Sequence, residues 1–393
     1  MTRAAIAEFL FPGRLVRYAS ASGDVGRLLE ALGVGQGSVV VVADRVVHKN
    51  GLTSALLRGL VEAGYTPHMF AEIAGEPEIE VVETAASIAA EADAVAFVGI
   101  GGGSALDTAK LVAYHAASGA PLRHLNGAVP FADAFGPLVM VPTTVGTGAE
   151  ATRVAMFSVG GAKRAVLSPQ FVPALAVLDE DLVRELPAPV VAATALDALS
   201  HAIESMMSTA SNELTWMFSG EAARRIFATL PAAYAGDASA RSELLYASFL
   251  AGVSLNAGVV LGHSMSYVLA ARHHLAHGVG CAIALPYCIA YNQGMRAEDG
   301  AELAATVLGR TGASLRDVAE AAQSLTRNVG VETDLRAFGT SAQEIPALAE
   351  SVARDYPRPT NPVPLEASRL GRLLSYLRSG DLPGAWAAMG ESA

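Results

Sequence analysis

The sequence predicts two domains of different class, an N-terminal α/β domain with a doubly wound parallel sheet and a C-terminal domain that is all α-helical. The 393 residues exceed the size at which a single hydrophobic core usually keeps growing. As far as Leu186, short apolar runs alternate with amphipathic helical segments, which is typical of a doubly wound sheet. Beyond Pro189 only helical periodicity is found. We therefore expect an α/β domain over residues 1–186 and a helical domain over residues 187–393.

The composition excludes several classes of protein. Hydrophobic residues make up 52% and charged residues 17% of the chain, so we expect no extensive disorder. A net charge of -11 without any basic stripe disfavours nucleic-acid binding. Cys281 and Cys288 are the only cysteines, and their number and spacing suggest neither a disulfide framework nor a thiolate metal site.

The sequence also predicts a soluble cytoplasmic protein without a membrane partner. The first fifteen residues are interrupted by Glu8 and Pro12, unlike the apolar region of a secretory leader. The apolar stretch 253–271 contains Asn256 and His263 and is too polar to span a bilayer. The low share of charge predicts that a second copy of the chain covers apolar surface, most simply in a homodimer.

The elements of the first domain follow from local patterns. Helices are predicted where apolar residues recur at helical spacing, with Gly33 ending the first and Pro77 preceding the third: 24–33, 52–63 and 78–91. Strands are predicted where short apolar, β-branched runs occur: 11–18, 38–43, 66–73, 94–98, 138–141 and 174–178.

A glycine-rich turn follows the strand at 94–98 and opens a helix at Gly101-Gly102-Gly103-Ser104. Glycines let the backbone approach a ligand closely, and the amides and positive end of the helix suit a pyrophosphate. Many such turns only pack tightly, but the strand and helix on either side favour a dinucleotide. The usual acidic residue downstream is absent, and the candidate, Asp44, lies upstream at the end of its own strand.

Asp44 predicts the choice of cofactor. A carboxylate at a strand end can accept hydrogen bonds from the adenosine ribose, and its charge would repel a 2′-phosphate. We therefore expect NAD(H) rather than NADP(H). Capping of the following helix is the competing role for Asp44.

A second polar loop follows the strand at 138–141. It brings four threonines, Thr143, Thr144, Thr147 and Thr152, close to the glycine turn in a loop that also contains two glycines. This pattern indicates further contacts to the cofactor, and an ordinary polar turn is the alternative.

The second domain is predicted from long Ala- and Leu-rich amphipathic segments. Its helices are expected at 190–207, 213–230, 238–256, 302–308, 315–329, 341–354 and 365–377. In the first of them Asp197 and His201 are four residues apart and share one face, which is the spacing of a bidentate metal ligand pair.

His263 and His277 could complete a metal site only if the chain bends between them. Fourteen residues of unbroken helix would separate them by roughly 20 Å. The segment from Arg272 through His273 and His274 to His277 and Gly278 is where we expect the bend. Imidazoles with one carboxylate suit Fe²⁺ or Zn²⁺, and the type of ligand does not choose between the two.

These motifs together resemble the iron-containing (group III) alcohol dehydrogenase family over nearly the whole chain. The resemblance rests on four stretches: Gly101–Ser104 with Asp107 and Lys110, Pro142–Glu150, Asp197–Glu204 and Thr360–Pro362. It implies an architecture like that of dehydroquinate synthase, with an active site between a nucleotide-binding and a metal-binding domain. It assigns the metal to Asp197, His201, His263 and His277.

The resemblance also implies the cofactor contacts. Gly102, Gly103 and Ser104 would hold the pyrophosphate, with Gly101 and Asp107 in the same motif. The four threonines would line the nucleotide, with Lys163 and Leu178 nearby.

The chain departs from the family pattern at two positions. The residue four after the third metal ligand is usually a histidine near the substrate, and here it is Tyr267, a poorer proton shuttle. His273 or His274 could replace it, or could be an ordinary loop residue. Ala149 stands where the family has a serine.

The expected function is hydride transfer between NAD(H) and an alcohol or aldehyde, or a hydroxy acid or oxo acid, whose oxygen the metal binds. Three alternatives remain. Oxidation of a 3-hydroxy acid at the same site could lead to loss of carbon dioxide. A lyase resembling dehydroquinate synthase is disfavoured by the lack of a dense Lys and Arg phosphate clamp. Tyr267 also leaves open a metal- and nucleotide-binding protein without turnover.

Overall fold

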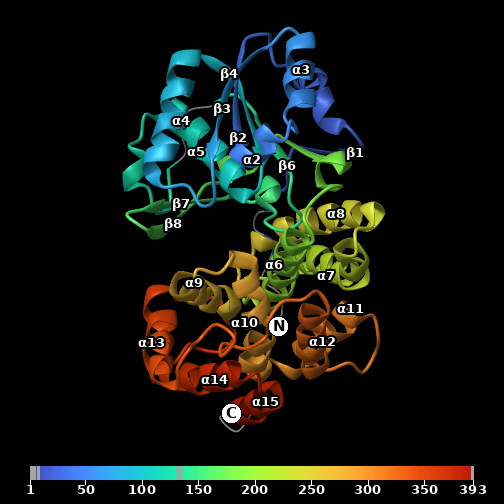
Figure 1. Ribbon diagram of the computed structural model, residues 1–393, viewed down its shortest axis with the longest axis vertical. Coiled ribbons are helices and arrows are strands. Elements are labelled where there is room, and N and C mark those ends of the chain that lie inside the picture. Colours follow the sequence, from blue (N-terminus) through green and yellow to red (C-terminus); the bar gives the residue numbers. More distant parts are fainter. Residues whose placement is uncertain (1–5, 7–8, 131–134, 391–393) are drawn as a thin grey trace. The chain divides into compact units, whose positions relative to one another are not determined.

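The computed structural model describes residues 6, 9–130 and 135–390 and divides the chain into two compact units (Figure 1). One unit is α/β and covers Leu10–Leu186, and the other is helical and covers Pro187 onward. Phe9 belongs to the helical unit, where its ring stacks on Phe218 at 5.9 Å. The segment in which the sequence predicts no leader lies partly outside the described residues.

The α/β unit is built on a six-stranded sheet, ordered β1-β9-β6-β4-β2-β3, in which every neighbouring pair is parallel. The strands are β1 (Arg14–Tyr18), β2 (Ser38–Asp44), β3 (Thr66–Ile73), β4 (Ala94–Gly101), β6 (Leu138–Pro142) and β9 (Leu175–Asp179).

Helices cover both faces of this sheet, because alternate residues of each strand point to opposite sides. Val40 and Val42 of β2 pack with the helices α4 and α5, whereas Val39 and Val41 pack with α1 and α3. The helices of this unit are α1 (Val25–Ala31), α2 (Arg45–Lys49), α3 (Ser54–Glu62), α4 (Ile79–Ala92) and α5 (Gly103–Ser118).

The carboxyl ends of β2, β4 and β6 meet at one edge of the sheet. Ala43 pairs with Ile100, and Gly101 pairs with Pro142. The strand β2 is followed in the chain by β3 on one side of the β2–β4 pair. The strand β4 is followed by β6 and then β9 on the other side. The ends of β2 and β4 therefore flank a topological switch point, where open α/β sheets bind ligands.

A small second sheet is present that the sequence analysis did not predict. It contains β5 (Gly127–Ala128), β7 (Val154–Val159) and β8 (Ala162–Leu167), with β7 and β8 antiparallel. Gly160 and Gly161, both at positive φ, form the two-residue turn between β7 and β8.

The helical unit contains no strand among its described residues, as the sequence predicted. Its helices are α6 (Ala188–Met207), α7 (Glu213–Tyr234), α8 (Ala238–Leu255), α9 (Leu261–His273), α10 (His277–Tyr291), α11 (Ala297–Leu308), α12 (Leu315–Asn328), α13 (Ile345–Asp355), α14 (Ala367–Ser379) and α15 (Leu382–Gly390). The fold class predicted from the sequence is thus confirmed.

The chain bends between α9 and α10, where His274 takes the left-handed conformation at φ 54° and ends α9. The bend lies within the segment where the sequence predicted it. None of the helices described here is both long and apolar enough to traverse a lipid bilayer.

Candidate active site

One face of α6 carries three buried ionisable side chains. Asp197, His201 and Glu204 lie at intervals of four and three residues and therefore point the same way. Their exposed fractions are 4%, 5% and 0%. Such groups are costly to bury unless they pair or bind a cation, so this face of α6 is a candidate binding site.

The bend between α9 and α10 brings His263 and His277 to this face. The Nε2 atoms of His201 and His263 each lie 3.7 Å from Oδ1 of Asp197, and Nε2 of His277 lies 3.6 Å from it. The three histidines that the sequence nominated as metal ligands therefore all approach the same oxygen of Asp197. The ligand atoms that lie within 4.8 Å of one another belong to Asp197, His263, His277 and Cys281, so His201 lies outside this tighter group.

The donor set fits a divalent cation. The distances are too long for hydrogen bonds, and Oδ1 of Asp197 is buried without a hydrogen-bond partner among the described residues. Two atoms that are each about 2.0–2.2 Å from one shared ion lie roughly 3.0–3.6 Å apart. Burial tends to raise the pKa of Asp197, but His201, His277 and His263 outweigh it and lower that pKa. Asp197 is therefore held as a carboxylate facing three imidazoles.

Glu204 orients His263. Its Oε1 lies 2.7 Å from Nδ1 of His263, and its Oε2 accepts the backbone N–H groups of Val260 and His263. A carboxylate on Nδ1 directs Nε2 toward the cation. This role was not predicted from the sequence, although the position of Glu204 seven residues after Asp197 on the same helix face would have indicated it.

Ser266 supports His277 in a similar way. Its Oγ lies 3.2 Å from Nδ1 of His277 and donates a hydrogen bond to the His277 carbonyl at 3.0 Å. The serine belongs to α9 and the histidine to α10, so the contact also fixes the angle of the bend.

Two glycines allow close approach of the helices that carry the metal cluster, the name used here for Asp197, His201, His263 and His277. A Cβ on Gly278 would lie 2.0 Å from the carbonyl oxygen of Ala193 in α6, and one on Gly262 would lie 2.4 Å from Oε1 of Glu204. Side chains at these positions would push α10 away from α6, or α9 away from Glu204.

Cys281 also lies in the cluster, although the sequence analysis set both cysteines aside. Its Sγ is 3.6 Å from Nε2 of His277 and 3.8 Å from Nε2 of His263, and the side chain is fully buried. Cys281 follows His277 by one helical turn, a spacing that could have pointed to it. Burial raises the pKa of the Cys281 thiol, which keeps it protonated in the absence of a cation.

Tyr267, the residue in place of the expected histidine, lies against the metal cluster. Its ring stacks on His277 with centroids 5.3 Å apart and planes 16° apart. Burial raises the pKa of Tyr267 to about 12. The phenol therefore stays protonated near neutral pH and can donate a hydrogen bond, but it is not a base.

The other two candidates for proton transfer have different surroundings. His273 lies at the end of α9, with Nε2 2.9 Å from Oγ1 of Thr340 and its ring against Phe338. Burial and the nearby Arg272 lower the pKa of His273. His274 is exposed and forms the left-handed end of α9.

The glycine turn lies at the carboxyl edge of the large sheet. Gly102 precedes α5 without a side-chain cap, and Gly101 has a φ of 151°. A Cβ on Gly101 would lie 3.0 Å from Cβ of Asp44, and one on Gly103 would lie 3.0 Å from Cγ2 of Thr147. The turn thus brings the ends of β2 and β4 and the threonine loop within contact of each other, with Ser104 in the first turn of α5.

Asp44 lies at this edge and caps α2. Its Oδ1 accepts the backbone N–H of Val46 at 2.8 Å and of Val47 at 3.4 Å. The capping role that the sequence left open is present, and it uses one of the two carboxylate oxygens.

The threonines differ in their partners. Oγ1 of Thr144 is buried and has no hydrogen-bond partner in the described chain, whereas the backbone N–H of Thr143 donates to the carbonyl of Gly101. Thr152 accepts a hydrogen bond from the buried ammonium of Lys110 at 3.1 Å. Thr144 therefore has a buried hydroxyl with unused hydrogen-bonding capacity.

Three other residues that were predicted to contact the cofactor interact with other residues of the protein. Asp107 pairs with Lys110 at 3.1 Å and accepts the backbone N–H of Met156. Lys163 on β8 pairs with Glu76 at 2.6 Å, and Leu178 is fully buried in β9.

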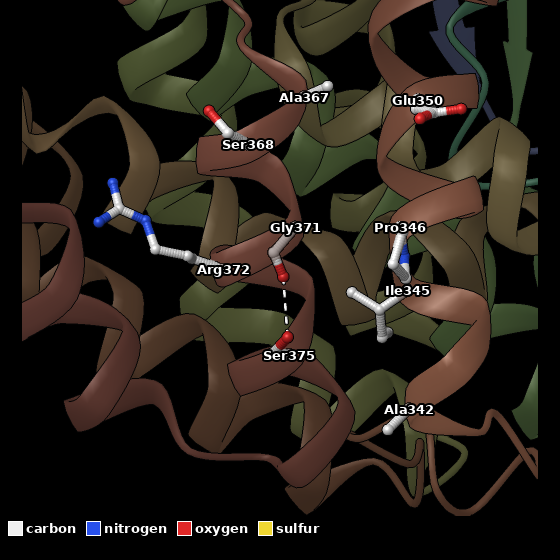
Figure 2. A pocket seen from close by; sticks show the side chains of 9 residues that line it. All are labelled: Ala342, Ile345, Pro346, Glu350, Ala367, Ser368, Gly371, Arg372 and Ser375. Atoms are coloured by element: carbon white, nitrogen blue, oxygen red, sulfur yellow. Dashed lines mark hydrogen bonds between the residues drawn. The ribbon is translucent and has the colours of Figure 1, made fainter.

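Two grooves in the helical unit lie apart from the cluster. One of about 460 Å³ runs between α13 and α14 and is lined by residues such as Pro346, Glu350 and Ser375 (Figure 2). The other, of about 500 Å³, lies between α9 and α13. Neither is lined by a residue of the metal cluster.

Fold and cluster together define a nicotinamide-linked, metal-dependent dehydrogenase, and comparison with known proteins identifies the family. The sequence profile of iron-containing alcohol dehydrogenases matches residues 12–180, and that of the C-terminal part of the Fe-containing alcohol dehydrogenase family matches residues 191–377. The chain belongs to the iron-containing alcohol dehydrogenase family. Hydride transfer between NAD(H) and an alcohol or aldehyde, the function predicted from the sequence, is confirmed at the level of this family.

Individual relatives cover nearly the whole chain. An NAD-dependent methanol dehydrogenase of Bacillus methanolicus is 30% identical over 90% of this chain and 95% of its own length. A sulfoacetaldehyde reductase of Bilophila wadsworthia is 29% identical over 79% of this chain and 83% of its own. The structure of an alcohol dehydrogenase from Oenococcus oeni matches with a TM-score of 0.87 and 27% identity, over 94% of this chain and 99% of that one.

Proposed function

We propose that this chain transfers hydride between NAD(H) and a small alcohol or aldehyde, or a hydroxy acid or oxo acid, at a divalent cation, Fe²⁺ or Zn²⁺. The cation would be held by Asp197, His201, His263 and His277. The observation that carries the proposal is the convergence of three imidazole nitrogens at 3.6–3.7 Å on a buried, unpartnered carboxylate oxygen.

The residues of the chain would have different roles in the reaction. A cation at this site supplies Lewis acidity, which lowers the pKa of an alcohol or polarises a carbonyl. Glu204 and Ser266 keep two imidazoles aligned, and the Tyr267 phenol donates a hydrogen bond beside them. His273 and His274 remain candidates for passing a proton. The contact of His273 with Thr340 and the exposure of His274 disfavour this role.

We propose that the glycine turn and the threonine loop bind the dinucleotide. The uncapped first turn of α5 offers backbone amides to the pyrophosphate, and Thr144 offers a hydroxyl. Asp44 has a second carboxylate oxygen for the adenosine ribose, which supports NAD(H) over NADP(H). Lys163 and Leu178 would contribute to the dinucleotide site through their positions in β8 and β9, and neither would offer a free polar group to the cofactor.

We further propose that the two units are the nucleotide-binding and metal-binding domains, with the boundary between Leu186 and Pro187, and that the protein is a cytoplasmic homodimer. The edge strand β1 supports self-association, since Tyr18 at its end and Phe11, which precedes the strand, are each 41% exposed. Sedimentation at several concentrations tests the dimer.

The proposed function is tested by elemental analysis of the purified protein together with an NADH absorbance screen of alcohols, aldehydes and hydroxy acids. We expect one Fe²⁺ or Zn²⁺ per chain and NAD(H)-linked turnover. His263→Ala should lose the metal with the fold retained, and His124→Ala, which changes an exposed histidine of the α/β unit, should keep it. Unchanged metal content in His263→Ala, or turnover without any change in NADH, would overturn the proposal.

A further inference from the structure

We propose that Arg358 binds an anionic group of the substrate, so that the preferred substrates are short alcohols or aldehydes bearing a carboxylate, sulfonate or phosphonate. The inference rests on the proposed function and names the substrate class for that site.

Arg358 is linked to the metal cluster through a single aromatic ring. Its guanidinium carbon lies 5.6 Å from the ring centroid of Tyr267, whose ring stacks on His277 at 5.3 Å. The guanidinium also hydrogen-bonds the Tyr267 side chain. A positive charge is thus held one phenol ring away from a proposed metal ligand.

The orientation of Arg358 is fixed by neighbouring residues. Nε donates to Oγ of Ser264 at 3.1 Å, and Oγ of Ser264 donates to the carbonyl of Tyr356 at 2.6 Å. Ser264 belongs to α9 and directly follows His263. The arginine is therefore anchored to the same helix that carries a metal ligand.

No carboxylate of the described chain forms an ion pair with Arg358. Asp355, three residues earlier in the chain, pairs with Arg354 at 2.7 Å, and Glu344, which precedes the same helix α13, bonds Nε of Arg272 at 2.7 Å. The protein thus places a cation beside the cluster without supplying its counterion.

Three other partly buried arginines, Arg17, Arg225 and Arg369, differ from Arg358. Arg17 bonds Glu180 at 3.0 Å, and Arg225 bonds Glu221 at 2.7 Å. Arg369 has no carboxylate, but its terminal nitrogen donates to the carbonyls of Tyr291 and Met389. For the terminal nitrogens of Arg358 the described residues provide neither a carboxylate nor a carbonyl.

A guanidinium of this kind suits a planar or tetrahedral oxyanion. Its N–H groups form a rigid fork that can make two parallel hydrogen bonds to a carboxylate, sulfonate or phosphonate. Arg358 is half-buried, so a solute can reach it and the charge is screened less than on the surface. Because relatives are named for both methanol and sulfoacetaldehyde, family membership does not decide the charge of the substrate.

The test compares anionic and neutral substrates of similar size. Succinate semialdehyde, sulfoacetaldehyde and phosphonoacetaldehyde are set against butanal and propanal, with NADH, in wild type, Arg358→Gln and Arg358→Lys. The matched control is Arg354→Gln, which changes an exposed arginine paired with Asp355. Elemental analysis and circular dichroism establish that every variant keeps its metal and fold.

We expect wild type to prefer at least one anionic aldehyde. Arg358→Gln should lower kcat/KM for that substrate by about 10–100-fold, mainly through KM, and change the neutral aldehydes far less. Arg358→Lys should recover part of the loss, and Arg354→Gln should behave as wild type. Equal losses for anionic and neutral substrates, or no preference in wild type, would overturn the inference.

A binding measurement separates this inference from the proposed function. Calorimetric titration of metal-loaded protein with 3-hydroxypropionate, 2-hydroxyethanesulfonate and 2-hydroxyethylphosphonate needs no turnover. Binding to wild type that is lost in Arg358→Gln supports the anion subsite even if no substrate is reduced, a result that would reject only the proposed function. Binding equal in both proteins, or absent from both, rejects the subsite.

Discussion

Single residues that never touch a substrate decide whether the metal cluster can form. Glu204 is the clearest case, because one carboxylate bonds Nδ1 of His263 and two backbone N–H groups at the start of α9. Without it, the His263 ring would lose the contact that fixes its orientation.

We expect Glu204→Gln to weaken metal binding by about 10–100-fold, since an amide holds the imidazole less firmly than a carboxylate does. Competition with a coloured chelator measures the affinity. Glu221→Gln, which changes a half-buried carboxylate of α7 outside the metal cluster, is the control. An affinity equal to that of wild type would show that His263 is oriented by packing alone.

Glu150 is a buried acidic residue of the α/β unit. It is 1% exposed, and neither carboxyl oxygen is hydrogen-bonded to another residue of the described chain. Burial raises the pKa of Glu150 from 4.5 to about 7. A carboxyl group with a raised pKa is more stable in the folded protein when it is protonated.

The stability of the protein should therefore depend on pH through Glu150. Between pH 4.5 and 7 the native state keeps a proton that the unfolded chain loses, so the unfolding free energy falls as pH rises through this window. Glu150→Gln lacks the effect and should be more stable than wild type by about 3 kcal/mol above pH 7, and equal to it below pH 4. Urea unfolding of both proteins from pH 4 to 8, without nucleotide, measures the difference. A difference that does not vary with pH would show that Glu150 is charged in the folded protein.

At the scale of elements, the site depends on how closely α10 approaches α6. Gly278 follows a proposed metal ligand, and the carbonyl of Ala193 occupies the space of the missing side chain. Backbone atoms cannot move aside cheaply, so the glycine sets the distance between the two helices.

We expect Gly278→Ala to destabilise the protein by about 1–3 kcal/mol and to weaken metal binding, because the new methyl group moves His277 away from Asp197. Thermal unfolding and elemental analysis measure the two effects. Gly371→Ala in α14 is the matched control, since the nearest atom to its new Cβ is 3.9 Å away. It should be neutral or stabilising by up to about 1 kcal/mol. Metal binding retained at full strength in Gly278→Ala would show that α10 can shift without disturbing the cluster.

Elements were predicted to different degrees. The strand order along the chain and the helices with a clear apolar stripe followed from local periodicity. The antiparallel pair β7 and β8 was missed, because β8 reads Ala-Lys-Arg-Ala-Val-Leu and lacks a continuous apolar run. The helices α9, α10 and α15 were also missed. Most residues of α9 and α10 are buried, and α15 is short and apolar on several sides, so none of the three shows a clear apolar stripe.

At the scale of the whole molecule, the metal should couple folding to pH. Its proposed ligands come from α6, α9 and α10, so a cation that binds only the folded protein stabilises the packing of these three helices. Removal of the metal with a chelator should lower the melting temperature, and metal affinity should be weaker in acid, where protons compete with the cation for its ligands. Calorimetry with and without chelator at pH 5.5 and 7.5 measures both. Melting that is unchanged by the chelator at pH 7.5 would mean that the cluster binds no cation in the folded protein.

The sequence by itself determined the two fold classes, the glycine turn and the pairing of Asp197 with His201 on one helix face, because each is encoded by spacing within one element. It also located the bend that brings His263 and His277 together. Only the tertiary structure decided that Glu204 orients His263, that Cys281 lies among the proposed ligands and that Arg358 stands beside Tyr267 without a counterion. Those contacts join residues on different elements, most of them far apart in the chain. Local periodicity does not contain them, because they depend on how the helices pack against one another.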